Sequence, residues 1–299
     1  MPTRRSWVQV PLPAPSRLLK MIIWIASYPK SGNTYLRSFI SSYYFTKDGS
    51  FNFDDLLNVQ QFPNIKFSKL KCETKEEASK SWIYNQKIFF DKEKITFLKT
   101  HSCLLEYHGN KFTSKNESIG GIYIIRDPRN VITSLKHHYS ISYKDALTNM
   151  INDRSGLVEK SFENDISNFS FISSWSNHYK SWINNNDFKV LLIKYEDLEK
   201  NKEEVFKKMI IFINQLIKNN EVVNETKLKN SIKSTNFNNL KNKEYNEGFE
   251  ESVYSKLTGK KVNFFNLGFN NRWQKILPSD IKNEMNLILQ KDIKYLNYN

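Results

Sequence analysis

Short apolar runs of strand length alternate with longer segments of helical periodicity along most of the chain. The apolar run at 22–26 is followed by apolar residues at helical spacing within 34–45, and further apolar runs occur at 95–101, 119–126 and 189–196. Continuous runs of this length are typical of strands that are buried on both faces, as in parallel sheets. The alternation therefore predicts a three-layer α/β/α domain with a central parallel sheet.

Other segments with helical spacing of apolar residues lie near 75–85 and over 128–139, 169–186, 202–218 and 278–296. Asp127 and Pro128 suit the cap and the first position of the helix over 128–139. The helix within 169–186 carries four ring side chains at helical spacing, and we expect them to pack in the core: Trp175, His178, Tyr179 and Trp182.

Two long segments show weak periodicity. Residues 46–94 are polar and aromatic, and we expect them to build much of a substrate pocket, because long excursions from an α/β core commonly carry binding residues. Residues 140–168 are polar, and we expect a mobile connection or a helix over the site.

The loop after the first apolar run has the composition of an anion-binding turn. It reads Tyr-Pro-Lys-Ser-Gly-Asn-Thr over 28–34 and leads directly into the first helix. Free backbone N–H groups at a helix start, next to Lys30, favour a bound anion. Gly32 allows the backbone to approach that ligand closely, and Thr34 can cap the helix or donate its hydroxyl to a phosphate oxygen. The loop is not a Walker A motif, which needs glycine before the lysine.

Polar residues follow the next two predicted strands. Lys99 and His101 end the run at 95–101, and Arg126 ends the run at 119–126. The carboxyl ends of parallel strands meet at one edge of a sheet, so these side chains should lie near the Lys30 loop. Ser134 lies two helical turns beyond Arg126, and an arginine with a hydroxyl suits a phosphate monoester.

The chain has 299 residues with 39% hydrophobic content and a net charge of +14, which points to anionic ligands, nucleic acid or a solvated lysine-rich face. No apolar run reaches the roughly 18 residues of a membrane span. Cys72 and Cys103 have neither metal-site spacing nor a disulfide framework, and a reduced, cytoplasmic setting is predicted.

Residues 1–20 differ in composition from the remainder. They contain four of the eight prolines and no Asn, Ile, Asp or Glu. The prolines interrupt any apolar region that a signal sequence would need. We therefore expect a disordered extension or an incorrectly assigned start, with the domain occupying 21–299.

Three of these motifs resemble those of sulfotransferases that use 3′-phosphoadenosine 5′-phosphosulfate (PAPS). The loop 28–34 resembles their 5′-phosphosulfate-binding loop, and 126–134, Arg-Asp-Pro-Arg-Asn-Val-Ile-Thr-Ser, is similar to their 3′-phosphate motif. Lys-Thr-His at 99–101 matches the segment that carries the catalytic histidine of cytosolic sulfotransferases. The resemblance covers about 21–296 and implies a sulfotransferase fold with a P-loop-like first turn.

Weaker likenesses lie in the second half of the chain. Tyr-Glu-Asp-Leu from Tyr195 is similar to a segment whose tyrosine lies near the adenine, and 234–237 is comparable with a Thr-x-Phe stretch that contacts the nucleotide. Residues 266–275 resemble the C-terminal Arg-Lys-Gly-x-x-Gly-Asp-Trp-Lys motif, in which Gly268 and Trp273 match. Asn266 and Leu267 replace its arginine and lysine, and Asn271 replaces the second glycine. Lys260 or Lys261 could substitute for the missing 3′-phosphate partner.

The resemblance implies transfer of a sulfuryl group from PAPS to a hydroxyl or amine, without a metal ion. Lys30 would hold the bridging oxygen, Lys99 would steady the sulfuryl oxygens, and His101 would take the acceptor proton, so that the rate falls at acid pH. Tyr35 would offer a face to the adenine. The implied nucleotide-binding residues are Lys30, Ser31, Gly32, Asn33, Thr34, Tyr35, Arg126, Ser134, Tyr195, Thr235, Phe237 and Gly268.

Two alternatives belong to other functional classes. A P-loop kinase that uses ATP would lack both the Walker spacing and a use for the Arg126 and Ser134 pair. A basic nucleic-acid-binding protein would explain the charge of +14, but not the polar residues at the strand ends. Tight binding of 3′-phosphoadenosine 5′-phosphate (PAP) would favour the sulfotransferase, for which no nucleic-acid partner is predicted. The sequence leaves open whether the acceptor is a small molecule, a carbohydrate, a lipid or a protein tyrosine. It also leaves open the oligomeric state.

Overall fold

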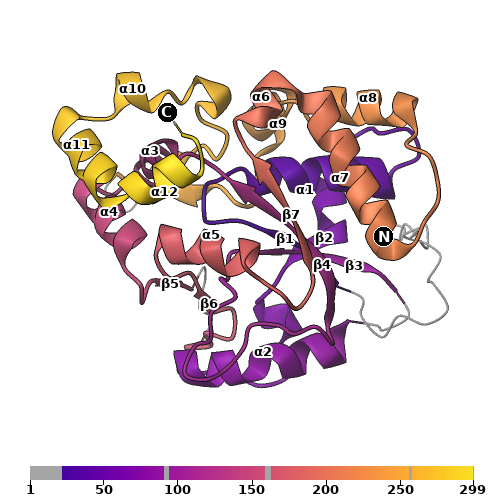
Figure 1. Ribbon diagram of the computed structural model, residues 1–299, viewed down its shortest axis with the longest axis horizontal. Helices are drawn as coiled ribbons and strands as arrows, with labels where there is room; N and C mark the ends of the chain where they lie inside the picture. Colours follow the sequence, from indigo (N-terminus) through magenta and orange to yellow (C-terminus); the bar gives the residue numbers. More distant parts are fainter. Residues whose placement is uncertain (1–21, 91–93, 159–162, 256–257, 299) are drawn as a thin grey trace.

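The computed structural model describes residues 22–90, 94–158, 163–255 and 258–298 of the chain (Figure 1). The interpretation of residues 1–20 as an extension or an incorrect start lies outside the described residues.

The centre of the fold is a five-stranded parallel sheet with the order β2-β3-β1-β4-β7. Its strands are β1 (Ile22–Ala26), β2 (Val59–Gln61), β3 (Thr96–Thr100), β4 (Ser118–Ile125) and β7 (Lys189–Lys194). Trp24 of β1 lies opposite Leu98 on one side and Gly121 on the other. Because β3 and β4 flank β1, the residues that follow these three strands emerge side by side, at the edge where α/β sheets bind ligands.

Helices cover both faces of the sheet, which confirms the predicted three layers (Figure 1). Alternate residues of β1 serve the two cores: Trp24 packs on one face, whereas Ile23 and Ile25 pack on the other. The helices are α1 (Asn33–Phe45), α2 (Lys75–Phe89), α3 (Pro128–Tyr139), α4 (Tyr143–Ile151), α5 (Trp175–Ile183), α6 (Asp197–Lys200), α7 (Lys202–Ile217), α8 (Glu225–Ser234), α9 (Phe237–Glu247), α10 (Trp273–Ile276), α11 (Ser279–Ile288) and α12 (Gln290–Tyr295).

Shorter elements lie between the main helices and strands along the chain. They are the 3-10 turns η1 (Phe53–Asn58), η2 (Ile65–Phe67) and η3 (Gly268–Asn270), and the strand pairs β5 (Gly156–Leu157) with β6 (Ser170–Phe171) and β8 (Val253–Tyr254) with β9 (Lys261–Val262). No helix in the described ranges combines the length and apolar character that a membrane crossing requires.

Most predicted elements agree with the structure to within a few residues. Helix α3 begins at Pro128, and the Asp127 side chain accepts a hydrogen bond from the Arg129 backbone, as a cap should. The helix predicted within 169–186 begins only at Trp175, because Ser174 caps it. Its four ring side chains are fully buried, which confirms the predicted core packing. The helix predicted over 278–296 is divided at Leu289 into α11 and α12.

Candidate active site

The loop between β1 and α1 has a backbone conformation that few sequences tolerate. Lys30 has φ 64° and Gly32 has φ 102°, so two of three consecutive residues are left-handed. A Cβ on Gly32 would lie 2.5 Å from Cδ2 of Tyr195, which excludes any side chain there. Asn33 donates from Nδ2 to the Ile25 carbonyl at 2.9 Å and so fastens the loop to the end of β1. Strain at Lys30, a non-glycine residue, is typical of a functional turn.

The Lys30 ammonium is buried without a polar partner. Its Nζ forms no hydrogen bond within the described ranges and lies 3.6 Å from the centre of the Phe264 ring. Burial lowers the pKa of Lys30 to about 7; Glu251 opposes this shift, and Lys99 and Arg126 add to it. A cation that lacks an anion in such surroundings is suited to bind one from outside.

Arg126 and Ser134 come together as the sequence predicts. A guanidinium N–H of Arg126 donates to Ser134 Oγ at 3.4 Å, and another donates to the Gly268 carbonyl at 3.1 Å. The guanidinium lies over the Tyr195 ring at 4.2 Å. Asn271 donates from Nδ2 to Ser134 Oγ at 3.1 Å, so the residue that replaces the motif's second glycine joins this site.

His101 follows β3 and is fixed in one tautomer. Its Nδ1 lies 2.9 Å from the Ser27 carbonyl, which can only accept, so Nδ1 carries the proton and Nε2 keeps its lone pair. Burial, and then the nearby Lys99, lowers the pKa of His101 to about 3. The ring is therefore neutral at neutral pH, with Nε2 able to accept a proton.

Three further histidines lie in or near this region. His178 lies 3.0 Å from the His101 carbonyl through Nε2 and 2.8 Å from the Tyr123 hydroxyl through Nδ1, and so supports the segment behind His101. His137 is partly exposed and lies 3.2 Å from the Asn263 carbonyl. His138 is buried and borders the cavity described below.

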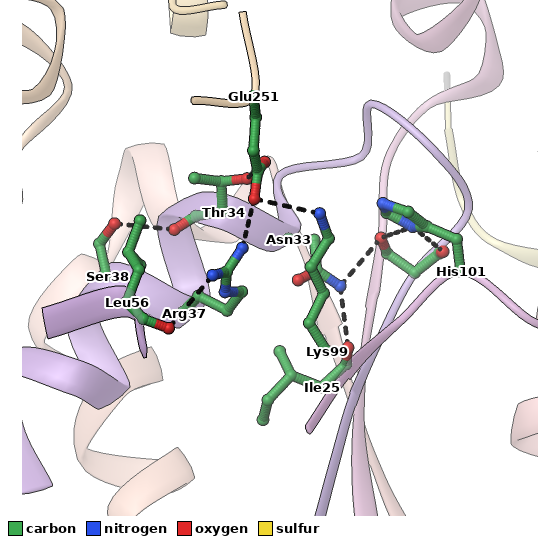
Figure 2. Close-up of polar contacts among 10 residues, drawn as sticks. Ile25, Asn33, Thr34, Arg37, Ser38, Leu56, Lys99, His101 and Glu251 are labelled. Atoms are coloured by element: carbon green, nitrogen blue, oxygen red, sulfur yellow. Dashed lines mark hydrogen bonds and ion pairs between the residues drawn. The ribbon is translucent and has the colours of Figure 1, made fainter. Parts of the chain in front are cut away.

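Glu251 is the main residue of this site that the sequence did not indicate. Its carboxylate accepts hydrogen bonds from Thr34 Oγ1 at 3.0 Å and from Lys99 Nζ at 3.3 Å, and it forms a close ion pair with Arg37 (Figure 2). Burial disfavours the charged carboxylate, but Lys99 and Arg37 outweigh burial and hold the pKa of Glu251 well below its usual range. Glu251 lies in a charge-rich segment without periodicity, so nothing in its surroundings singles it out.

Lys30, His101, Arg126 and Glu251 border one cavity of about 1420 Å³. That volume exceeds the roughly 300–1,000 Å³ of most small-molecule pockets, so a nucleotide and a second molecule can occupy it together. The sequence-predicted residues that line it are Lys30, Gly32, Asn33, Thr34, Tyr35, Lys99, His101, Arg126, Ser134, Tyr195, Phe237 and Gly268.

Ser31 and Thr235 differ from the other predicted residues. Neither belongs to the described residues that line the cavity, and Lys260 and Lys261 are also absent from that set. Thr235 is buried and donates its hydroxyl to the Ser231 carbonyl at 2.7 Å, so it closes the end of α8. Ser31 is buried, and its backbone N–H donates to the Tyr28 carbonyl at 3.3 Å.

Comparisons with known proteins agree with this geometry. The sulfotransferase domain family model matches residues 21–296. A rabbit (Oryctolagus cuniculus) amine sulfotransferase is 22% identical over 240 residues, which are 78% of this chain and 70% of that protein. The luciferin sulfotransferase of Photinus pyralis is 25% identical over 238 residues, and this match covers 74% of this chain and 56% of the firefly protein.

Solved structures share the fold. A mouse sulfotransferase in complex with PAP has a TM-score of 0.55 and 17% identity, with 91% of this chain and 84% of that chain covered. A retinol dehydratase in complex with androsterone and PAP also has a TM-score of 0.55, with 16% identity and with 91% and 80% covered. The family match favours the sulfotransferase prediction over the ATP-dependent kinase and the nucleic-acid-binding protein. The chain belongs to the sulfotransferase domain family and is an enzyme of that family.

Proposed function

We propose that this enzyme transfers a sulfuryl group from PAPS to a hydroxyl or amine of a small-molecule acceptor. One observation carries the proposal: the Lys30 loop and the Arg126–Ser134 pair border the same cavity, after adjacent strands. PAPS carries an anion at each of the two corresponding ends, the 5′-phosphosulfate and the 3′-phosphate. ATP has no 3′-phosphate for the second pair.

The donor's 5′ end fits the Lys30 loop. Thr34 Oγ1 and free N–H groups at the start of α1 suit the 5′-phosphate, and Lys30 suits the oxygen that bridges phosphorus and sulfur. Phosphate charge near Lys30 would offset the burial that lowers its pKa, so binding favours the charged ammonium. Lys99 then neutralises the sulfuryl oxygens in a loose, in-line transfer.

The 3′-phosphate fits the Arg126 side of the cavity. The guanidinium and the Ser134 hydroxyl supply donors, and the Asn271 amide lies within reach of Ser134. Tyr195 and Tyr35 both contact Phe269, with ring centres 5.0 and 6.4 Å apart, and these rings offer faces for the adenine. Asn271 therefore stands in for part of the basic C-terminal motif that this chain lacks.

His101 supplies the base for the acceptor. Its Nε2 takes the acceptor proton while the acceptor oxygen or nitrogen bonds to sulfur and the bond from sulfur to the bridging oxygen breaks, leaving PAP. A neutral imidazole in a fixed tautomer is suited to this step. The acceptor approaches from the side lined by η1, β2 and η2, where Gln60, Gln61, Asn64 and Ile65 border the cavity.

Calorimetry with PAP tests the nucleotide site. Lys30→Ala, and Arg126→Ala combined with Ser134→Ala, should each weaken PAP binding by about tenfold or more, since a charge-assisted hydrogen bond contributes roughly 1.5–3 kcal/mol. The matched controls Lys47→Ala and Arg154→Ala remove exposed cations and should bind PAP like the wild type. Unchanged affinity in both site variants would contradict the assignment.

A transfer assay with PAPS labelled in its sulfuryl group tests the chemistry. Phenols, alkyl amines, alcohols and sugars should be screened together, with the label followed into the acceptor. Label that appears only as free sulfate with every acceptor class would argue against transfer to the acceptors proposed here.

A further inference from the structure

The carboxylate of Glu251 lies where the proposed function needs an anion from the donor. Glu251 belongs to a segment that we call the strap, residues 248–255, which runs from the end of α9 through β8. Its side chain reaches the start of α1 and the end of β3, where Thr34, Arg37 and Lys99 converge on it (Figure 2). All three partners donate hydrogen bonds, and two of them carry positive charge.

Two of the three partners are residues that the proposed function assigns to the phosphosulfate. Thr34 is the hydroxyl proposed for the 5′-phosphate, and Lys99 is the cation proposed for the sulfuryl oxygens. A carboxylate and a phosphoryl or sulfuryl group recruit the same donors through oxygen atoms of similar size and charge. Two anions on these donors at once would repel each other in buried surroundings.

We propose that Glu251 occupies the 5′-anion subsite while the donor is absent, and that the donor must displace it to bind. The proposal rests on the proposed function, because that function assigns Thr34 and Lys99 to the donor. Glu251 then competes with the 5′ anion of the donor for the same hydrogen-bond donors. Donor binding therefore requires the strap to rearrange.

The charge of Glu251 also offsets the burial of two cations. Arg37 and Lys99 are buried, with side chains 7% and 5% exposed, and buried cations without a partner destabilise a fold. Glu251 supplies the missing charge, while its own side chain remains 26% exposed. The side chain of Glu251 is therefore less enclosed than those of the two cations that it pairs.

The strap is fastened at points that do not depend on Glu251. Ser252 donates its hydroxyl to Glu244, and the same carboxylate accepts the backbone N–H groups of Phe264 and Phe265 at 2.6 and 2.8 Å. At the other end, α9 stops at Gly248, whose φ of 80° favours glycine. Glu251 can leave the subsite while Glu244 keeps Phe264 over Lys30.

The test compares PAP affinity in three proteins by calorimetry. Glu251→Gln should bind PAP about tenfold or more tightly than the wild type, because removing a competitor raises the fraction of binding-competent protein. Glu250→Gln makes the same charge change at an exposed neighbour that also borders the cavity but does not pair with Arg37 or Lys99, and it should match the wild type within about twofold. Adenosine 3′-phosphate, which lacks the 5′ anion, should bind equally to all three proteins.

Thermal unfolding supplies a second readout. Without ligand, Glu251→Gln should melt below the wild type, because it leaves Arg37 and Lys99 unpaired, and PAP should raise its Tm more than that of the wild type. If Glu251→Gln does not fold, Glu251→Asp keeps the charge on a shorter side chain, and its PAP affinity should lie above the wild-type value.

PAP affinity in Glu251→Gln that is unchanged or weaker would overturn the proposal. Turnover lost at unchanged PAP affinity would instead place Glu251 in the chemistry. A wild type that binds PAP no more tightly than adenosine would contradict the proposed function. A titration with inorganic pyrophosphate would then test, independently of that function, whether Glu251 occupies the 5′-anion subsite. Tighter pyrophosphate binding by Glu251→Gln than by Glu250→Gln would support it, and equal binding would refute it.

Discussion

The two cationic sites of the cavity balance their charge in opposite ways. At the Lys30 loop, the neighbouring Lys99 and Arg37 share the Glu251 carboxylate, and Lys30 itself faces an aromatic ring. Arg126 is held by neutral groups, the Ser134 hydroxyl, backbone carbonyls and the Tyr195 ring. No carboxylate within the described ranges forms an ion pair with Arg126.

This difference implies that the charge of the Arg126 site is constant, whereas the charge available at the Lys30 site depends on conditions. A guanidinium stays charged at every physiological pH and keeps its geometry when neutral acceptors hold it. A buried lysine changes its pKa readily, and a carboxylate can compete for its neighbours. We therefore expect the 3′ site to anchor the nucleotide under all conditions, and the 5′ site to respond to pH and to Glu251.

The largest expected effect is on turnover in variants of His101, with little change in nucleotide binding at either anion site. His101→Ala should lower turnover by about 10²–10⁴-fold, the usual contribution of a general base, and should leave PAP affinity nearly intact. His101→Asn should do the same with less disturbance of packing. His108→Ala is the matched control, because its ring is exposed and lies outside the cavity lining, and should keep wild-type turnover. A comparable loss in His138→Ala alone would move the base to the other buried histidine that borders the cavity.

The dependence of kcat/KM on pH in acid solution should reflect the burial of His101. The unperturbed pKa of about 6.5 predicts a rate that falls in mildly acid solution. Burial lowers the pKa of His101 to about 3, so Nε2 stays unprotonated and kcat/KM should hold through that range. A loss of kcat/KM centred near pH 6.5 would show that His101 titrates normally or is not the base.

Truncated nucleotides test the two sites separately. Arg126→Ala should remove most of the preference for PAP over AMP, which lacks the 3′-phosphate. Lys30→Ala should remove most of the preference for PAP over adenosine 3′-phosphate. Each preference should shrink by about tenfold to a hundredfold, the size of one charge-assisted contact. If either variant weakens both preferences equally, the sites are not independent and the comparison fails.

What the sequence predicts well is local in the chain. The strand, the glycine and the helix start around Lys30 lie within a few residues of each other, and their chemistry follows from backbone geometry. Arg126 and Ser134 are eight residues apart, and the cap at Asp127 fixes where the helix between them begins. The carboxyl-edge rule then places Lys99 and His101 beside them.

What the sequence does not predict comes from distant, irregular segments. Glu251 meets Arg37 across 214 positions, and Asn271 meets Ser134 across 137. Neither lies in a segment whose hydrophobic pattern indicates which way it faces. Thr235 is the converse case. The likeness of 234–237 to a nucleotide-contacting stretch predicts that Thr235 contacts the nucleotide, whereas its hydroxyl bonds the Ser231 carbonyl at the end of α8.

The pH dependence of PAP binding tests the conditional character of the 5′ site. Burial lowers the pKa of Lys30 to about 7, so the free protein loses this charge as pH rises above 7. A bound anion favours the charged form, so PAP affinity should fall by up to about tenfold per pH unit above 7 until the pKa of the complex is reached. Adenosine 3′-phosphate should bind evenly from pH 7 to 9, and Lys30→Arg should flatten the PAP profile. A flat profile in the wild type would show that the ammonium stays charged.

The smallest expected effect concerns the neutral partner of the 3′ site. Asn271→Ala removes the amide that donates to Ser134 Oγ and that accepts the Thr133 hydroxyl at 2.7 Å. A neutral hydrogen bond contributes roughly 0.5–1.5 kcal/mol, so PAP affinity should fall about twofold to tenfold, while AMP affinity stays unchanged. Asn270→Ala, at an exposed neighbour, is the control. If Asn271→Ala weakens AMP as much as PAP, then Asn271 shapes the whole cavity, and the 3′ site depends on Arg126 and Ser134 alone.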